Sequence, residues 1–314
     1  MNRAHLLRWT TPLLVVAAAC SGPGCGKTSP SAAPVALDAD RAWKHLEALV
    51  AFGPRPPGSP ALEATRAYLE AELARTGLKP AREAFDAKTP LGNFALANVY
   101  ADLPAATPDA ERVILATHFD TKLGIDGFVG ANDGGSGTAL LLELARVLAQ
   151  GGPRMLAYRF LFLDGEEATR PQWQGEDNCY GSRHHAKELA KRGEASRVRA
   201  FVLLDMVGDA DLALLRETWS DRRLVDLFRA AAGRAGLAGV FSNQSQAIED
   251  DHGPFLDAGI PSLDLIDFEY GPGNAYWHTT DDVLAHCSKE SLAKVGRVVL
   301  EALPALERDF RRAR

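Results

Sequence analysis

Short apolar runs alternate with longer amphipathic stretches along most of the chain. Apolar runs rich in β-branched and aromatic residues predict strands at 95–101, 113–117, 158–163, 200–204 and 262–266. Stretches with helical periodicity predict helices at 38–52, 60–76, 137–150, 181–191, 221–235 and 288–312. Short strands that alternate with helices indicate an α/β fold, in which a largely parallel sheet is covered by helices on both faces.

The composition is that of an ordinary globular protein. Of the 314 residues, 46% are hydrophobic and 24% are charged, and the formal net charge is −6. These proportions argue against wholesale disorder, a protein with several membrane spans and a collagen-like fibre. Because no basic stripe offsets the acidic balance, we expect no nucleic-acid partner. No linker interrupts the pattern after Asp38, so residues 38–314 are predicted to form a single domain.

The first residues differ in composition from the rest. Arg3 and Arg8 form a cationic start, and a short apolar run then ends in small residues just before Cys20. This layout predicts a secretory signal peptide at 1–19, and Cys20 resembles the lipidated cysteine of a bacterial lipoprotein. Residues 20–37, rich in Ser, Gly, Pro and Ala, are predicted to be a flexible tether. We expect export to the cell envelope, at the periplasmic face or the outer membrane. The lipid on Cys20 would then be the contact with the membrane. The alternative is that the signal is cleaved and the protein is secreted.

Polar side chains follow the predicted strands where each strand ends. Since ligands bind at the carboxyl ends of the strands in such sheets, these side chains are expected to converge on one rim. They are His118, Asp120, Glu166, Glu167 and Asp205, joined by Asp133 from a glycine-rich loop and His278 from a later loop. Crowded carboxylates repel unless a cation neutralises them, and a set of Asp, Glu and His without cysteine suits catalytic Zn²⁺. In the adjacent Glu166-Glu167 pair, one carboxylate can bind the metal while the other acts as an acid/base.

Several of these segments match one enzyme family. They are His118–Lys122, Phe128–Asp133, Asp164–Ala168, Tyr180–His184, Glu249–Phe255 and Trp277–Thr279. Together they closely resemble the animal-type zinc-dependent glutaminyl cyclases (glutaminyl-peptide cyclotransferases), which share their fold with the co-catalytic zinc aminopeptidases. The resemblance covers essentially the whole domain. It implies a three-layer sandwich in which helices flank a mixed, mostly parallel central sheet.

The resemblance also implies a reaction and a set of roles. The substrate is a peptide or protein with an N-terminal glutamine, which is converted to pyroglutamate with release of ammonia, and the enzyme is expected to be a monomer. One Zn²⁺ is held by Asp133, Glu167 and His278, while Glu166 is the general acid/base and Asp205 orients the amine. The remaining implied residues are Trp173 and Trp277 in the pocket wall, and Asp250, His252 and His118 behind the catalytic groups.

Alternatives remain open at this point. A two-zinc aminopeptidase would bind one metal with His118, Asp133 and Asp205 and the other with Asp133, Glu167 and His278, so a second zinc site is not excluded. A metal-free binding domain of the same fold is a third hypothesis. The chain departs from the cyclase pattern at Gly134, where that family has a serine after the aspartate. Cys179 and Cys287 are expected either to pair or to remain buried thiols.

Overall fold

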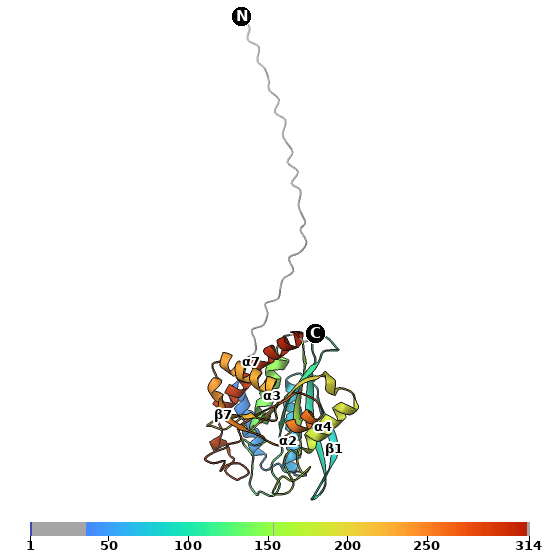
Figure 1. Cartoon of the computed structure of the whole chain (residues 1–314), viewed down its shortest axis with the longest axis vertical. Coiled ribbons are helices and arrows are strands. Elements are labelled where there is room, and N and C mark those ends of the chain that lie inside the picture. Colours follow the sequence, from blue (N-terminus) through green and yellow to red (C-terminus); the bar gives the residue numbers. More distant parts are fainter. Residues whose placement is uncertain (2–35, 153, 313–314) are drawn as a thin grey trace. The chain divides into compact units, whose positions relative to one another are not determined.

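The computed structural model of the chain describes Met1 and residues 36–152 and 154–312 (Figure 1). The predicted signal peptide and nearly all of the predicted tether lie outside the described residues. From residue 36 onward the chain folds as one unit. No helix in this described part combines the length and the apolar character that crossing a bilayer requires.

A six-stranded sheet forms the middle layer, with the strand order β1-β2-β4-β3-β5-β8. Its strands are β1 (Pro80–Thr89), β2 (Gly92–Leu103), β3 (Arg112–His118), β4 (Ala157–Leu163), β5 (Val198–Asp205) and β8 (Ser262–Ile266). Strands β4, β3, β5 and β8 run parallel to one another, whereas β1 and β2 form an antiparallel hairpin whose strand β2 pairs antiparallel with β4. The predicted mixed, mostly parallel sheet is therefore confirmed.

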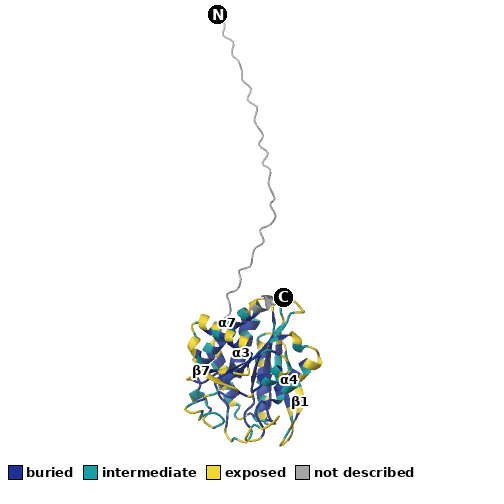
Figure 2. Ribbon diagram, viewed as in Figure 1, coloured by how far each residue is buried: buried dark blue, intermediate teal, exposed yellow. Residues whose placement is uncertain are grey.

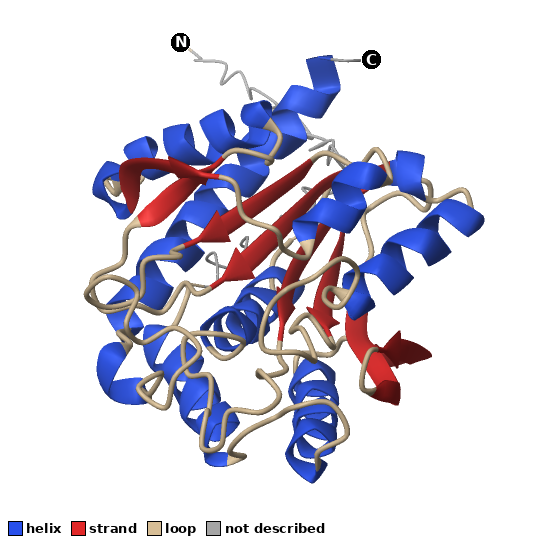
Figure 3. Cartoon of the chain, turned by 60° about the horizontal axis from the view of Figure 1, so that its bottom comes forward, coloured by secondary structure: helices blue, strands red, loops and turns tan. Residues whose placement is uncertain are grey.

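Helices cover both faces of this sheet (Figure 3). One layer contains α1 (Ala39–Ala51), α2 (Pro60–Arg75), α3 (Ser136–Ala149), α5 (Arg222–Arg234) and α7 (Lys289–Arg312). The other contains α4 (Tyr180–Lys191) and the short α6 (His252–Asp257). Single 3-10 turns lie at Ala195–Arg197, Ala238–Val240 and Leu284–His286. The three-layer arrangement follows the sequence prediction.

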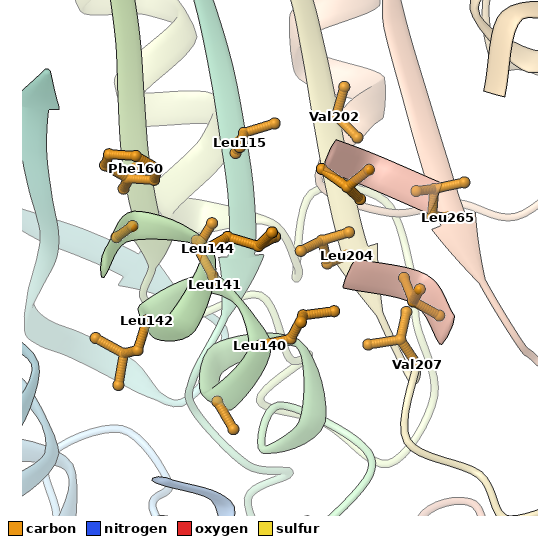
Figure 4. Packing of buried hydrophobic residues seen from close by; sticks show 14 of the residues in the cluster. Leu115, Leu140, Leu141, Leu142, Leu144, Phe160, Val202, Leu204, Val207 and Leu265 are labelled. Atoms are coloured by element: carbon orange, nitrogen blue, oxygen red, sulfur yellow. The ribbon is translucent and has the colours of Figure 1, made fainter. Parts of the chain in front are cut away.

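The central strands are apolar on both faces because each face is covered. Val113 and Leu115 of β3 pack into the core beneath α1, α3 and α7, and the alternate residues Ile114 and Ala116 pack into the core beneath α4 and α6. Figure 4 shows Leu115 on its strand and Leu140, Leu141 and Leu144 on α3, all within the same buried cluster. Buried residues accordingly concentrate in the middle layer and on the inner faces of the helices (Figure 2).

Local signals in the sequence fix where several helices begin. The side chain of Asp38 accepts hydrogen bonds from the amides of Asp40 and Arg41 at the start of α1. Ser59 caps α2 in the same way and is followed by Pro60 at the first helical position. Asp221 caps α5. These caps explain why the predicted helix boundaries agree with the structure to within a residue or two.

Four elements were not predicted from the sequence: β1, α6, and the strands β6 (Leu214–Glu217) and β7 (Phe241–Gln246), which pair with each other in a separate small sheet. The sequence of β1 contains three alanines together with single Asp, Glu and Lys residues, which do not favour strands. Its conformation comes from continuous antiparallel pairing with β2, from Pro80 opposite Ala101 to Thr89 opposite Gly92. Tertiary pairing here overrides local propensity.

A buried arginine joins the N-terminal helical region to the loops at the carboxyl end of β3. Arg55 is fully buried, and its guanidinium donates to the carbonyl oxygens of Phe119 at 2.9 Å, Val129 at 2.7 Å and Gly130 at 3.1 Å. Its own amide donates to the hydroxyl of Thr121 at 2.8 Å. The loops that follow β3 are thus fixed by one side chain.

We expect Arg55→Met to lower the free energy of unfolding by about 3 kcal/mol or more, because several buried carbonyl groups lose their donors. Chemical denaturation measures this change. Arg223→Met is the matched control, since its side chain is 82% exposed and pairs with Asp221 at the surface. Equal stability of the Arg55 and Arg223 variants would contradict the assigned role.

Candidate active site

Three neighbouring parallel strands bring the predicted site residues to one rim. His118 ends β3, Asp205 ends β5, and Glu166 and Glu167 follow β4. Asp133 enters from the loop before α3, and His278 enters from the loop after β8. Because β4, β3 and β5 are adjacent and parallel, their carboxyl ends place these side chains together, as the strand pattern predicts.

Asp133, Glu167 and His278 offer three ligand atoms that lie within 4.8 Å of one another. Nε2 of His278 is 3.1 Å from Oε1 of Glu167 and 3.4 Å from Oδ2 of Asp133. Among the described residues, the buried atoms Asp133 Oδ2 and Glu167 Oε2 have no hydrogen-bond partner. Two orphaned carboxylate oxygens beside an imidazole nitrogen form a donor set that suits zinc, and three protein ligands leave a coordination position open.

His118 takes part in a second set that shares Asp133. Its Nε2 is 3.1 Å from Oδ1 of Asp205 and 3.2 Å from Oδ1 of Asp133, and the ligand atoms of the three residues also lie within 4.8 Å of one another. His118 therefore lies directly against Asp205 and Asp133. The two sets, joined by one carboxylate, have the residue composition that a two-metal site requires.

Two buried carboxylates that sequence reasoning left without a role hold the backbone of the site. Asp120 accepts from the amides of Glu166 at 3.1 Å and Glu167 at 3.3 Å. Asp282 accepts from the amides of Asn132 at 2.7 Å and Asp133 at 3.0 Å. The position of Asp120 after β3 was a usable signal, whereas nothing in the sequence separates Asp282 from an ordinary loop aspartate.

Backbone geometry at the rim is unusual and explains the departure at Gly134. The φ of Gly134 is +78°, and a Cβ at this position would lie 2.4 Å from the carbonyl oxygen of Asp120. A serine therefore cannot replace Gly134 without moving the backbone. His278 has a φ of +53°, and Met206, directly after Asp205, has a φ of +47°. Such strain in non-glycine residues is held by surrounding structure and tends to gather at functional sites.

Burial and crowding raise the pKa values of three groups in the site. Burial, reinforced by the negative charges of Glu167, Asp250 and Asp251, raises the pKa of Glu166 well above its usual value, although His118 opposes this shift. Burial likewise raises the pKa of Asp205. The pKa of His278 rises to about 10, because the attraction of Glu167 and Asp133 exceeds the effect of burial. Positive charge is thus strongly favoured among these carboxylates.

A cavity of about 780 Å³ opens above these groups. Asp133, Glu166, Asp205 and His278 reach its surface, and both predicted tryptophans line it. The ring of Trp277 stacks on His278 with the centroids 4.0 Å apart, and Phe268 meets Trp277 edge to face at 5.0 Å. Phe268 is only partly buried and belongs to the cavity wall.

The residues predicted behind the catalytic groups occupy different places. Asp250 is buried and contributes to the cavity wall together with Asp205. His252 is buried beside Glu217 and Asp264, with Nε2 of His252 3.2 Å from Oε2 of Glu217. It thus lies behind Asp250, against residues other than Asp205. Glu217, which sequence reasoning missed, anchors this region by accepting from the amides of Trp219, Ser220 and Ile248.

The two described cysteines do not form a disulfide. Cys179 precedes α4, Cys287 follows the last 3-10 turn, and both are buried free thiols. Sγ of Cys287 lies 3.8 Å from the hydroxyl of Tyr270. Of the two alternatives left open by the sequence, the unpaired one holds in this structure.

The chain is similar to known proteins across nearly all of the described domain. Residues 98–303 match Peptidase family M28. A glutaminyl-peptide cyclotransferase-like protein of Mus musculus is 33% identical over 295 residues, which cover 84% of this chain and 74% of the mouse protein. A solved structure of an Acidobacteriales bacterium glutaminyl cyclase is 33% identical, with a TM-score of 0.84 over 90% of this chain and 99% of that chain. A Zn-dependent exopeptidase from Parabacteroides distasonis is 28% identical, with a TM-score of 0.78 over 88% of this chain and 99% of that chain. The chain therefore belongs to peptidase family M28 and, within it, to the glutaminyl-peptide cyclotransferases.

Proposed function

We propose that this chain is a zinc-dependent glutaminyl-peptide cyclotransferase, which converts the N-terminal glutamine of peptides or proteins to pyroglutamate and ammonia. The observation that carries the proposal is the similarity to an Acidobacteriales bacterium glutaminyl cyclase over 90% of this chain. The geometry agrees with it: acid/base carboxylates reach a tryptophan-lined cavity beside a three-ligand metal set. The residues of a two-zinc aminopeptidase ligand set are also present, but no other feature of the site favours that activity.

Asp133, Glu167 and His278 would hold the zinc ion. When bound, the ion supplies Lewis-acid polarisation of the γ-carbonyl oxygen of the substrate glutamine. The surrounding residues fix these ligands: Asp282 holds the backbone of Asp133, and Asp120 holds the backbone of Glu167. Stacking of Trp277 on His278 restricts the imidazole ring. Such support keeps ligand atoms in place before the substrate arrives.

Glu166 is the proposed general acid/base. Its carboxylate reaches the cavity surface directly beside the ligand Glu167, so it can face both nitrogens of the bound glutamine. It accepts a proton from the α-amine as that nitrogen attacks the γ-carbon, and it then donates the proton to the departing ammonia. One carbon–nitrogen bond forms, one breaks, and the proton is returned.

Asp205 and the tryptophans are proposed to prepare the substrate. Asp205 lies in the same cavity wall, where it orients the neutral α-amine and can pair the positive charge that develops on this nitrogen as it attacks. Ring closure requires a near-attack geometry of a flexible side chain, so holding the amine close to the γ-carbon supplies much of the rate gain. Trp173 and Trp277 line the cavity and exclude water that would hydrolyse the amide instead.

The N-terminal residues carry a separate proposal. Residues 1–19 act as an export signal, and Cys20 with the segment to residue 37 anchors and tethers the catalytic domain at the cell envelope. The cationic start, the short apolar run and the small residues before Cys20 support this assignment. The domain itself is expected to work as a monomer.

The first prediction separates the two activities. We expect the purified, zinc-loaded chain to make a glutamine-initiated peptide lighter by the mass of one ammonia, and to leave a leucine-initiated peptide of otherwise identical sequence intact. Mass spectrometry and an ammonia assay follow the two peptides side by side. Release of free leucine or glutamine in place of cyclisation would establish the aminopeptidase alternative.

The second prediction separates the two adjacent glutamates. Glu166→Gln keeps the shape of the side chain but removes its basicity, so turnover should fall about 100-fold or more while zinc content stays at the level of the unaltered chain. Glu167→Gln is the matched variant and should lose zinc. Zinc retention is read by metal analysis after dialysis. Loss of zinc from Glu166→Gln alone would mean that the roles are reversed.

The third prediction concerns the number of metal ions. We expect one tightly bound zinc per chain, so His278→Ala should lose the metal whereas His118→Ala should retain it. Metal analysis and competition with a chelator measure stoichiometry and affinity. Two tightly bound ions per chain, with one lost in each variant, would contradict the single-zinc assignment.

A further inference from the structure

A second cavity, of about 440 Å³, adjoins the active-site cavity. The two share Glu249 and Asp250, which belong to the walls of both. On its other sides the second cavity is lined by Trp219, Arg183 and Asp257, together with part of α6 and the loop before it. A peptide whose first residue occupies the active-site cavity therefore has a second hollow directly across the shared wall.

Trp219 gives this second cavity an aromatic surface. Its side chain is 51% exposed, which is unusual for a tryptophan in a concave region of a folded domain. The backbone beneath it is fixed, because the buried Glu217 accepts from the amide of Trp219 at 2.9 Å and from that of Ile248 at 3.1 Å. One buried carboxylate thus anchors both the tryptophan and the segment that forms the shared wall.

The charges around the second cavity are predominantly negative. Glu249 and Asp257 are exposed, and neither forms an ion pair with any residue in the described ranges. Asn178 donates to Oε1 of Glu249 at 3.1 Å and accepts from the guanidinium of Arg183 at 2.6 Å, so one amide holds these two side chains on the wall. Two exposed carboxylates against one tethered guanidinium leave an excess of negative charge beside an aromatic face.

We propose that the second cavity is a subsite for a basic side chain, lysine or arginine, located downstream of the N-terminal glutamine of the substrate. The proposal rests on the proposed cyclotransferase function, since that function places the peptide's first residue in the adjoining cavity. The cationic group lies over the ring of Trp219 and pairs with Asp257 and Glu249. An acidic side chain would face two carboxylates, and an apolar one would leave both unpaired.

The test compares kcat/KM values for a matched set of glutamine-initiated peptides with the zinc-loaded full chain. Arginine, leucine or glutamate is placed in turn at the second, third and fourth positions of a pentapeptide amide, and the dipeptide amide Gln-Ala is the reference that is too short to cross the wall. At one of these positions, we expect the kcat/KM of the arginine peptide to exceed that of the glutamate peptide about fivefold or more, as a cation–π contact plus one exposed ion pair implies. This arginine-to-glutamate ratio is the measure of the subsite. Trp219→Ala and Asp257→Asn should each reduce this ratio about twofold or more. Asp109→Asn, an exposed charge loss at the amino end of β3, should leave the ratio unchanged.

The outcomes distinguish this subsite from the function itself. Failure to cyclise even the dipeptide amide overturns the proposed function, and the subsite with it. Cyclisation of the dipeptide amide with equal rates for the arginine and glutamate peptides leaves the function standing and overturns the subsite. A preference for arginine that survives in both Trp219→Ala and Asp257→Asn also overturns it, because the selectivity then arises elsewhere.

Discussion

The site depends on the neutralisation of carboxylates that the fold crowds together and buries. Asp120, Asp133, Glu166, Glu167 and Asp205 all lie at the carboxyl ends of three adjacent strands or in the loops next to them, and all are buried. Their mutual repulsion in a poorly solvated region is costly unless positive charge lies among them. The buried side chains of His118, Lys122 and Arg55 supply part of this charge, and a zinc ion would supply the rest.

The fold holds these carboxylates in place with covered parallel strands and with hydrogen bonds to the backbone amides of the loops. Parallel strands covered on both faces fix the positions of His118 and Asp205, while buried carboxylates bind the loop amides: Asp120 those of Glu166 and Glu167, Asp282 that of Asp133. Close packing leaves little freedom at these points. A Cβ on Gly137, at the start of α3, would lie 2.2 Å from the carbonyl oxygen of Leu204, so the helix sits directly against the end of β5.

Structures similar to this chain include both a glutaminyl cyclase and a Zn-dependent exopeptidase. Both candidate ligand sets are present and share Asp133, so the ligands alone do not separate a cyclotransferase from an aminopeptidase. Trp173, Trp277 and Phe268 line the cavity above these ligand sets, and Glu249 belongs to the walls of both cavities. Substrate choice is thus a property of loops carried by a common sheet.

The sequence by itself determined the α/β architecture, the central strands and most helix boundaries, because apolar periodicity and capping residues act locally. It also predicted that Asp133, Glu166, Glu167, Asp205 and His278 come together, since a parallel sheet brings polar residues at its strand ends to one rim. Only the tertiary structure decided that β1 is a strand, that Asp282 holds the loop of Asp133, that His252 contacts Glu217 and that Gly134 has no room for a side chain. Each of these features depends on contacts between residues distant in sequence, and no local sequence pattern indicates such contacts.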